Sequence, residues 1–137
     1  LIDPGVIDAL VVALEKDSQA PMATVIQEFL PDEDKNDPHI VKVTVDEQAY
    51  AKTFSRDVPH TRGQVYKHIG IYAYKKNFLL TFSAMPKSEN EMSERLEQLR
   101  VLDAGYRIKT ILTDKETIGV DTPEDLKKVQ ERLSSHG

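Results

Sequence analysis

The chain has 137 residues, a length that suits one domain with a modest hydrophobic core. Its 39% of hydrophobic and 30% of charged residues are ordinary for a globular protein, and no window is apolar over the ~20 residues that a membrane helix needs. The net charge of −5 argues against a general nucleic-acid binder, and the lack of cysteine excludes disulfides and thiolate metal sites. With no visible signal peptide, these features favour a cytoplasmic protein.

The first part of the chain predicts a helix followed by a strand. Asp3 suits an N-cap, and Pro4 suits the first helical position. Apolar residues then recur near the helical period, which predicts a helix over residues 4–17. These residues are Val6, Leu10, Val11 and Leu14. The β-rich residues 22–29, which follow a proline, predict a strand.

The next part predicts a β-hairpin. Residues 31–38 form a polar segment between two prolines, which is typical of a loop. Residues 40–45 alternate and are β-branched, and residues 49–55 resume the strand pattern after a turn at 46–48. We therefore expect two strands, 40–45 and 49–55, to pair with each other.

The middle of the chain returns to a loop, a strand and a helix. Residues 56–67 are rich in charge, Pro and Gly, which indicates a loop. Residues 68–74 (HIGIYAY) are mostly apolar, which predicts a strand buried on both faces. Residues 75–84 predict a short helix.

A capping box marks the start of the next predicted helix. Ser88 stands three residues before Glu91, and Gly105 stands where a C-cap belongs. The apolar stripe between them is Met92, Leu96, Leu99 and Leu102. One helix is therefore expected from Ser88 to Gly105, followed by an alternating strand over residues 107–112.

The last predicted helix begins at Thr122, with a proline and two acidic residues directly after it. Its buried face would be Leu126, Val129 and Leu133. The predicted fold is therefore α/β with a mixed sheet. Because the parallel strands have few partners within the chain, we expect an open apolar edge, covered by a missing front half or by a partner chain.

Single residues do not indicate a function. His68 at the start of an apolar strand is more often structural, Arg56 in a loop is usually a solvated charge, and Asp121 before an N-cap can simply favour the helix dipole. Glu97 and Gln98 in a helix are surface residues by default. Motifs for a Walker loop, a dinucleotide-binding loop, a zinc protease helix and a nucleophile elbow are all absent from the sequence.

Four blocks in order carry more information than any single residue. They are residues 54–56 (FSR), 66–74 (YKHIGIYAY), 96–102 (LEQLRVL) and 119–126 (GVDTPEDL). In this order they resemble 3-deoxy-manno-octulosonate cytidylyltransferases, also called CMP-Kdo synthetases, and the likeness extends to residues 38–43 and to the first four residues. The resemblance covers nearly the whole chain and implies the C-terminal half of such an enzyme.

The resemblance implies a Rossmann-like nucleotide-diphospho-sugar transferase fold that lacks its N-terminal nucleotide-binding half. Members of the family join CTP and 3-deoxy-manno-octulosonate (Kdo), release pyrophosphate and form CMP-Kdo for lipopolysaccharide synthesis. Their Gly-rich phosphate loop and Q-G-D-E-P block do not occur in this sequence. We therefore expect a single sugar-binding and dimer-forming portion, inactive alone, that associates as a homodimer with no nucleic-acid or membrane partner.

The resemblance implies sugar-binding roles for five residues, and their chemistry fits. Arg56 could bind the Kdo carboxylate through two parallel hydrogen bonds. His68 and Tyr72 are four apart on a strand, so both would face one pocket. Glu97 and Gln98 could bind further hydroxyl groups from the edge of their helix.

Asp121 is the predicted magnesium ligand and the one catalytic residue expected in this half. Mg²⁺ ions that bridge phosphates need hard oxygen ligands, and a carboxylate from each half would hold the metal. The anomeric hydroxyl of the sugar would then attack the α-phosphate of CTP.

Two other hypotheses stay open from the sequence. The chain could serve a different 2-keto sugar acid, such as sialic acid, with the same chemistry and another pocket. It could also be a non-catalytic α/β interaction module that kept the scaffold.

Overall fold

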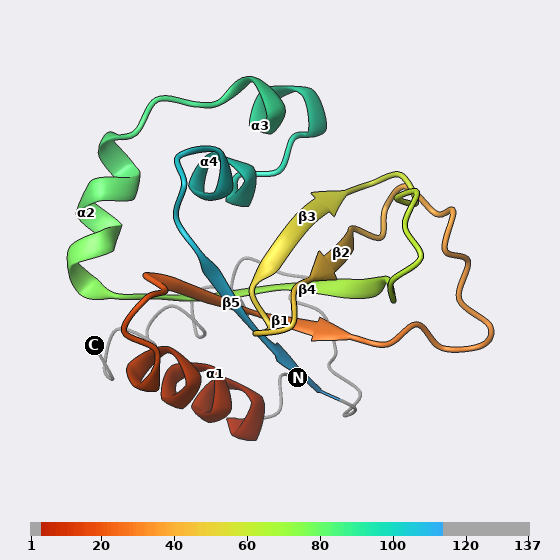
Figure 1. Ribbon diagram of the computed structural model, residues 1–137, viewed down its shortest axis with the longest axis horizontal. Coiled ribbons are helices and arrows are strands. Elements are labelled where there is room, and N and C mark those ends of the chain that lie inside the picture. The colour runs from red at the N-terminus through yellow and green to blue at the C-terminus, as the bar shows by residue number, and fades with distance from the viewer. Residues whose placement is uncertain (1–3, 114–137) are drawn as a thin grey trace.

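A computed structural model describes residues 4–113, in which a five-stranded mixed sheet forms the centre of the molecule (Figure 1). The strands lie in the order β3-β2-β4-β1-β5. They are β1 (Met22–Gln27), β2 (Lys42–Val45), β3 (Ala51–Ser55), β4 (Tyr66–Tyr74) and β5 (Ile108–Leu112). The β2–β3 hairpin is confirmed, β4 runs antiparallel to β1 and β2, and β5 runs parallel to β1, as the predicted mixed α/β class requires.

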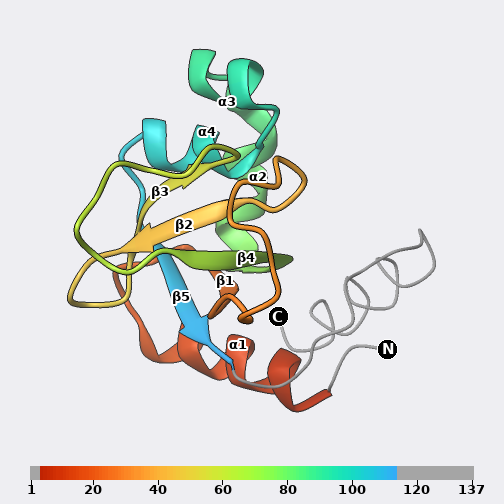
Figure 2. The ribbon, with the colours of Figure 1, turned by 90° about the vertical axis from the view of Figure 1, so that its right-hand side faces the viewer.

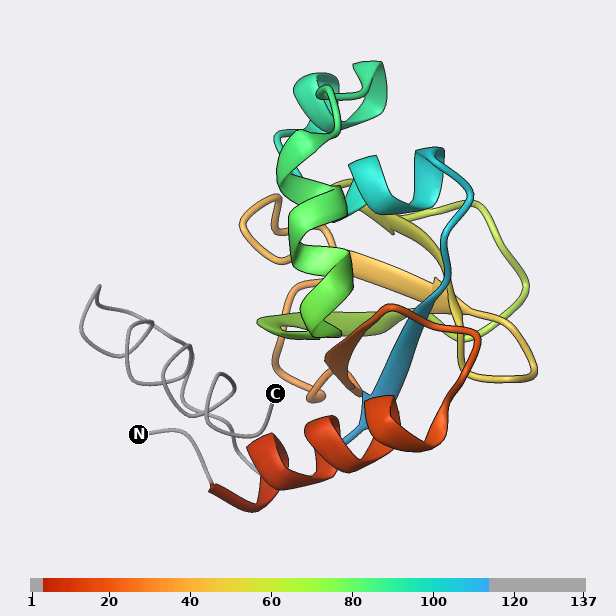
Figure 3. The same ribbon diagram turned by 90° about the vertical axis from the view of Figure 1, so that its left-hand side faces the viewer.

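Helices cover the two faces of the sheet unequally. They are α1 (Pro4–Lys16), α2 (Lys76–Ala84), α3 (Glu89–Glu94) and α4 (Gln98–Asp103). Figures 2 and 3 show α1 on one side of the sheet and the other three helices on the opposite side. The predicted Asp3 cap and the helix predicted from Thr122 lie outside the described residues.

Two hydrophobic clusters hold these layers together. One lies between α1 and the sheet, where Leu10 and Leu14 pack with Val25 and Ile71. The other lies under α2 and α4, where Phe54, Phe78 and Leu99 are among the buried residues. The apolar periodicity of α1 and the composition of β1, which is buried over almost its whole length, both match these two contacts.

The strand β4 differs from the prediction that it is buried on both faces. Only Ile71 and Ala73 are buried, while His68 and Tyr72 are partly exposed. The pairing with β1 changes register between Thr24 and the next residue, so that two residues of β4 have no partner there, and such bulges bend a strand. On its other side β4 pairs with β2 only near its start, so this strand is not enclosed as the prediction assumed.

The single helix predicted from Ser88 to Gly105 is wrong, because the chain breaks into α3 and α4. Arg95 has a left-handed backbone (φ 59°) and its N–H closes α3 on the carbonyl of Glu91. The capping box at Ser88 and the positive φ of Gly105 are confirmed. As a result Met92, expected in the buried stripe, is 58% exposed.

The break allows a buried ion pair that an unbroken helix excludes. Residues nine apart on one helix point in opposite directions, yet Arg100 of α4 meets Glu91 of α3 through two hydrogen bonds of 2.8 and 2.6 Å. The Arg100 guanidinium also lies 4.6 Å from the centre of the Phe82 ring on α2. This pair fixes the three helices to one another.

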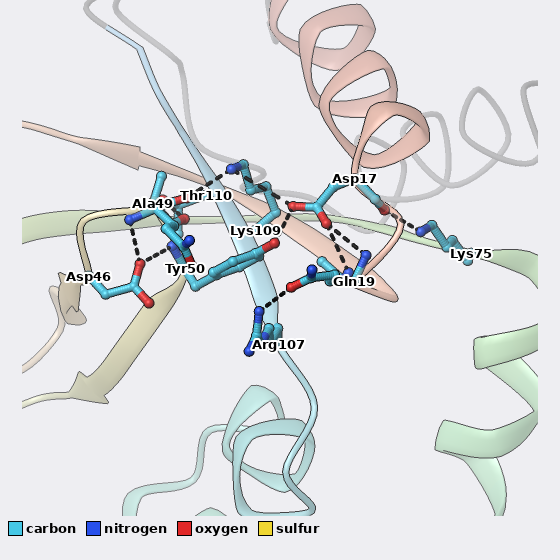
Figure 4. A network of polar contacts seen from close by, with 11 residues as sticks. Asp17, Gln19, Asp46, Ala49, Tyr50, Lys75, Arg107, Lys109 and Thr110 are labelled. Atoms are coloured by element: carbon cyan, nitrogen blue, oxygen red, sulfur yellow. Dashed lines mark hydrogen bonds and ion pairs between the residues drawn. The ribbon is translucent and has the colours of Figure 1, made fainter.

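The outer edge of β5 is partly covered by the turn of the β2–β3 hairpin. Ala49 accepts hydrogen bonds from the Thr110 N–H and hydroxyl at 2.8 and 2.7 Å, and Tyr50 bridges to Lys109. The Tyr50 hydroxyl donates to Asp17, just after α1, at 2.7 Å. We call these five residues the edge latch (Figure 4).

The latch qualifies the prediction of an open apolar edge. On β5 the hairpin turn supplies a short substitute for a neighbouring strand. On β4, no described strand pairs beyond the first residues on the side of β2, so an unpaired edge is present there instead. Among the helices of residues 4–113, none is long and apolar enough to cross a membrane.

Candidate functional site

A cavity of about 410 Å³ lies where β4 meets the link between α3 and α4. It is lined by four of the five predicted sugar-binding residues, which are His68, Tyr72, Glu97 and Gln98. Residues 39–41 close a further side. Cavities of this size accept ligands as large as a sugar.

The alternation of side chains along β4 determines which of its residues form the floor of the cavity. His68, Gly70 and Tyr72 share one face of β4, and all three line the cavity. The His68 ring lies 5.4 Å from that of Tyr72 and packs edge-on against Phe54 at 5.0 Å. A Cβ added at Gly70 would meet nothing within 4 Å, so the glycine leaves the floor open.

The wall opposite β4 comes from the start of α4. Gln98 is 4% exposed, and its side chain makes no hydrogen bond to any residue in the described part of the chain. The adjacent Glu97 is exposed and forms no ion pair within residues 4–113. A buried amide without a protein partner is costly, so a ligand at Gln98 would satisfy it.

The hydrogen bonds of Thr24 fix the tautomer of His68. The Thr24 hydroxyl lies 2.8 Å from the carbonyl of Ile71 and 2.8 Å from Nε2 of His68. A carbonyl only accepts, so the hydroxyl donates to Ile71 and must accept from His68. Nε2 therefore carries the proton, and Nδ1 is left with a lone pair that can accept a hydrogen bond.

Burial keeps the aromatic groups of the cavity neutral. It lowers the pKa of His68 to about 4, well below the ordinary 6.5, and raises the pKa of the Tyr72 hydroxyl above its usual 10. The Tyr72 hydroxyl makes no hydrogen bond to a described residue. At neutral pH the floor thus offers one acceptor, one hydroxyl and no charge.

Arg56 is not brought into the cavity with the other four predicted residues. Its guanidinium donates to the carbonyls of Glu94 and Pro38, each at 3.1 Å. Its own carbonyl accepts from the buried Lys42 ammonium at 2.5 Å. In this structure Arg56 ties a loop to the end of α3.

The predicted magnesium ligand, Asp121, lies outside the described residues. Within residues 4–113, no group of three His, Cys, Asp or Glu side chains could hold a metal ion. The metal prediction therefore stays a prediction.

Sequence reasoning missed several residues of the site. His39, Lys67, Gly70 and Arg95 line the cavity, and Thr24 orients His68 from behind. Strand alternation from His68 and Tyr72 could have found Gly70. The contribution of Arg95 depends on a helix break that no glycine or asparagine marks in the sequence.

The matching protein family and the most similar relatives agree with each other. A protein family described as cytidylyltransferase matches residues 1–111. The 3-deoxy-manno-octulosonate cytidylyltransferase of Syntrophotalea carbinolica is 42% identical over 97% of this chain, and that of Geotalea uraniireducens is 44% identical over 97%. The chain covers 59% of the length of each of these relatives.

A solved structure agrees with the sequence matches. The chain superposes with a TM-score of 0.79 and 35% identity on a CMP:2-keto-3-deoxy-manno-octonic acid synthetase that was solved in complex with CTP. The match covers 99% of this chain and 58% of that one. The predicted resemblance and the partial fold are both confirmed by these comparisons.

Proposed function

The chain belongs to the cytidylyltransferase family, and from this premise we propose that it supplies the sugar-acid pocket of an enzyme that transfers CMP from CTP to Kdo. The observation that carries the proposal is the cavity beside β4, which gathers His68, Tyr72, Glu97 and Gln98. Relatives named for this activity, 42% and 44% identical, support the choice of Kdo.

The free polar groups of the cavity match the hydroxyl groups of a sugar. A hydroxyl both donates and accepts, so it can donate to Nδ1 of His68 and accept from the Tyr72 hydroxyl. The Gln98 amide offers both kinds of group, and the Glu97 carboxylate accepts only. Because these groups are fixed by the sheet and by α4, they would orient the sugar rather than only attract it.

In the proposed reaction the anomeric hydroxyl of Kdo attacks the α-phosphate of CTP. A bond forms between that oxygen and the α-phosphorus, the bond from the α-phosphorus to the oxygen that bridges to the β-phosphate breaks, and the hydroxyl proton passes to solvent as pyrophosphate leaves. The described residues would hold the sugar so that its reacting oxygen points out of the cavity. Mg²⁺, for which we propose Asp121 as a ligand, would offset the charge on the pyrophosphate.

We propose that these 137 residues bind the sugar acid but do not turn over CTP by themselves, because the sequence contains no Gly-rich phosphate-binding loop. In the cell the activity would serve lipopolysaccharide synthesis. An assay with the chain, Kdo, CTP and Mg²⁺ should release no pyrophosphate, and steady release would contradict this part of the proposal.

Calorimetric titration tests the sugar-acid pocket directly. The chain should bind Kdo and discriminate against sialic acid. A His68→Phe variant, which keeps a ring but removes the acceptor at Nδ1, should bind Kdo about tenfold more weakly. A preference for sialic acid would contradict the assignment of Kdo.

We also propose that the chain associates as a homodimer. The unpaired edge of β4 and the exposed Leu79 and Leu80 of α2 leave backbone and apolar surface for a partner copy. Light scattering should give a mass that rises with concentration. A constant mass near 15.5 kDa would contradict association.

A further inference from the structure

Thr24 lies on β1, fully buried behind the floor of the cavity, and it is not one of the residues that line it. Its hydroxyl lies 2.8 Å from the carbonyl of Ile71 and 2.8 Å from Nε2 of His68. The carbonyl of Ile69 lies 3.4 Å away. One buried side chain thus makes polar contacts with three residues of β4, whereas a residue that only filled the core would need none.

The first consequence of these contacts concerns the bulge in β4. The register between β1 and β4 changes just after Thr24, so that residues 70 and 71 have no partner on β1. Such a bulge interrupts the ladder of backbone hydrogen bonds. The Thr24 hydroxyl donates to the Ile71 carbonyl at this point, so a side chain supports the bulge where backbone pairing is interrupted.

The bulge brings two residues of the cavity floor together. In a regular strand, residues four apart are separated by about 13 Å along the strand. The rings of His68 and Tyr72, however, lie only 5.4 Å apart between their centroids, and both residues line the cavity. A bend of β4 at the bulge accounts for this approach, because bulged strands curve locally.

The second consequence concerns the proton on the His68 ring. Whichever carbonyl receives the hydroxyl proton of Thr24, the same oxygen has to accept from Nε2 of His68. The ring is neutral at neutral pH, since burial lowers its pKa to about 4. Its edge-on packing against Phe54, at 5.0 Å, restricts its rotation. Thr24 therefore determines that Nδ1 is an acceptor and not a donor.

We propose that Thr24 is a positioning residue for sugar binding, which acts through the bulge of β4 and through the tautomer of His68. Without its hydroxyl, Nε2 of His68 would lose its acceptor and the Ile71 carbonyl would lose a donor. The two tautomers of His68 would then lie closer in energy. The tautomer with its proton on Nδ1 cannot accept a hydrogen bond there from a sugar hydroxyl. This inference rests on the proposed function.

The test follows the tautomer and the affinity in the same variants. Nitrogen-15 NMR of the imidazole rings shows which nitrogen carries the proton, and the signal of His68 is the one that disappears in His68→Phe. Thr24→Val keeps the shape of the side chain but removes the hydroxyl. It should show a mixture of His68 tautomers and bind Kdo about tenfold more weakly in calorimetric titration. Thr24→Ser keeps the hydroxyl and should keep both the tautomer and the affinity.

Thr110→Val is the matched control. Thr110 is the register partner of Thr24 on β5 and is 4% exposed. Its hydroxyl also donates to a backbone carbonyl, that of Ala49, at 2.7 Å. Thr110→Val should therefore also lower stability in urea unfolding, but it should change neither the tautomer of His68 nor the affinity for Kdo. A loss of affinity in Thr24→Val alone then cannot be a general effect of a buried hydroxyl removed from the sheet.

The possible results separate this inference from the proposal on which it rests. If the unchanged chain does not bind Kdo, the proposed function fails, and the role of Thr24 in binding fails with it. If the unchanged chain binds Kdo and Thr24→Val binds it equally well, the role of Thr24 is overturned while the proposed function stands. A weaker affinity with an unchanged tautomer would overturn the route through His68. If Thr24→Val does not fold, the unchanged chain still decides, because a proton on Nδ1 of His68 would overturn the inference.

Discussion

The edge latch and the cavity are both polar, but their hydrogen bonds differ. In the latch, the Asp17 carboxylate accepts from the Tyr50 hydroxyl and from the backbone N–H groups of Gln19 and Ala20, and Lys109 lies 3.8 Å away. Lys75 donates to the carbonyl of the same aspartate. In the cavity, by contrast, the Tyr72 hydroxyl, the Gln98 amide and Nδ1 of His68 have no hydrogen-bond partner in the described part of the chain. Polar groups whose hydrogen bonds are satisfied within the protein stabilise the fold, whereas groups without such partners are available to a ligand.

The pKa values show the same difference. Burial works to raise the pKa of Asp17, but hydrogen bonds from Tyr50 and the backbone outweigh it and hold the pKa below its ordinary value. For His68, burial is the cause and lowers the pKa to about 4. The latch therefore stabilises the charged form of Asp17, whereas burial at the cavity favours the neutral form of His68.

The largest expected effect is a loss of stability in α3 and α4, the segment that forms the wall of the cavity with Glu97 and Gln98. Glu91→Ala leaves the Arg100 guanidinium buried without its carboxylate, and breaking such a pair should cost about 3 kcal/mol of unfolding free energy. Urea unfolding measures this loss. The matched control is Glu89→Ala in the first turn of the same helix, which is exposed and should change little. Equal stability of the two variants would show that the wall does not depend on the pair.

The pH dependence of stability should follow from His68. Its folded pKa of about 4 lies below the ordinary 6.5, so the unfolded chain binds more protons between these values. The contribution is complete above pH 6.5 and is lost as the pH falls, by about 3 kcal/mol at pH 4. Chemical unfolding at a series of pH values checks this.

The upper part of this window isolates His68 from the buried carboxylates. The pKa values of Glu91 and Asp17 are lowered from 4.5 and 3.8, so their contributions are lost only at lower pH. A His68→Phe variant should show a flat profile between pH 5 and 6.5, whereas His39→Gln should keep the slope. A flat profile in the unchanged chain would mean that His68 is not held neutral by burial.

An intermediate effect is expected from filling the cavity. Gly70→Leu places a side chain where no atom lies within 4 Å of the added Cβ, so folding should be little affected. The side chain would occupy the cavity floor and should weaken binding of Kdo at least about tenfold in calorimetry. Gly63→Leu, in a loop away from the cavity lining, serves as the control. Unchanged affinity of Gly70→Leu would place the ligand elsewhere.

The smallest effect is expected from the latch. Tyr50→Phe removes the hydroxyl that donates to Asp17 but leaves the ring, over which Arg107 and Lys109 lie. Because Asp17 keeps its backbone donors, the loss in urea unfolding should be less than half that of Glu91→Ala. Binding of Kdo should not change. A weakened affinity would mean that the latch and the cavity are coupled.

The sequence was most informative where local pattern determines structure. Alternation predicted the strands of the hairpin and β5, and the apolar period predicted α1, because both patterns follow from which side chains face the core. It was least informative at Arg95, where tertiary contacts between Glu91 and Arg100 outweigh the local preference for a continuous helix.

In the candidate site, too, local sequence pattern could place only some of the residues. His68 and Tyr72 could be placed together from strand geometry alone. The position of Arg56 depends on the carbonyls of Pro38 and Glu94, which are distant in sequence, so no local pattern could exclude it from the cavity. The role of Thr24 depends on the register between β1 and β4, which only the folded sheet reveals.

The left-handed backbone at Arg95 also predicts how this position should vary. If a library of variants were selected for heat resistance alone, residue 95 should drift towards glycine or asparagine, which tolerate that conformation at lower cost.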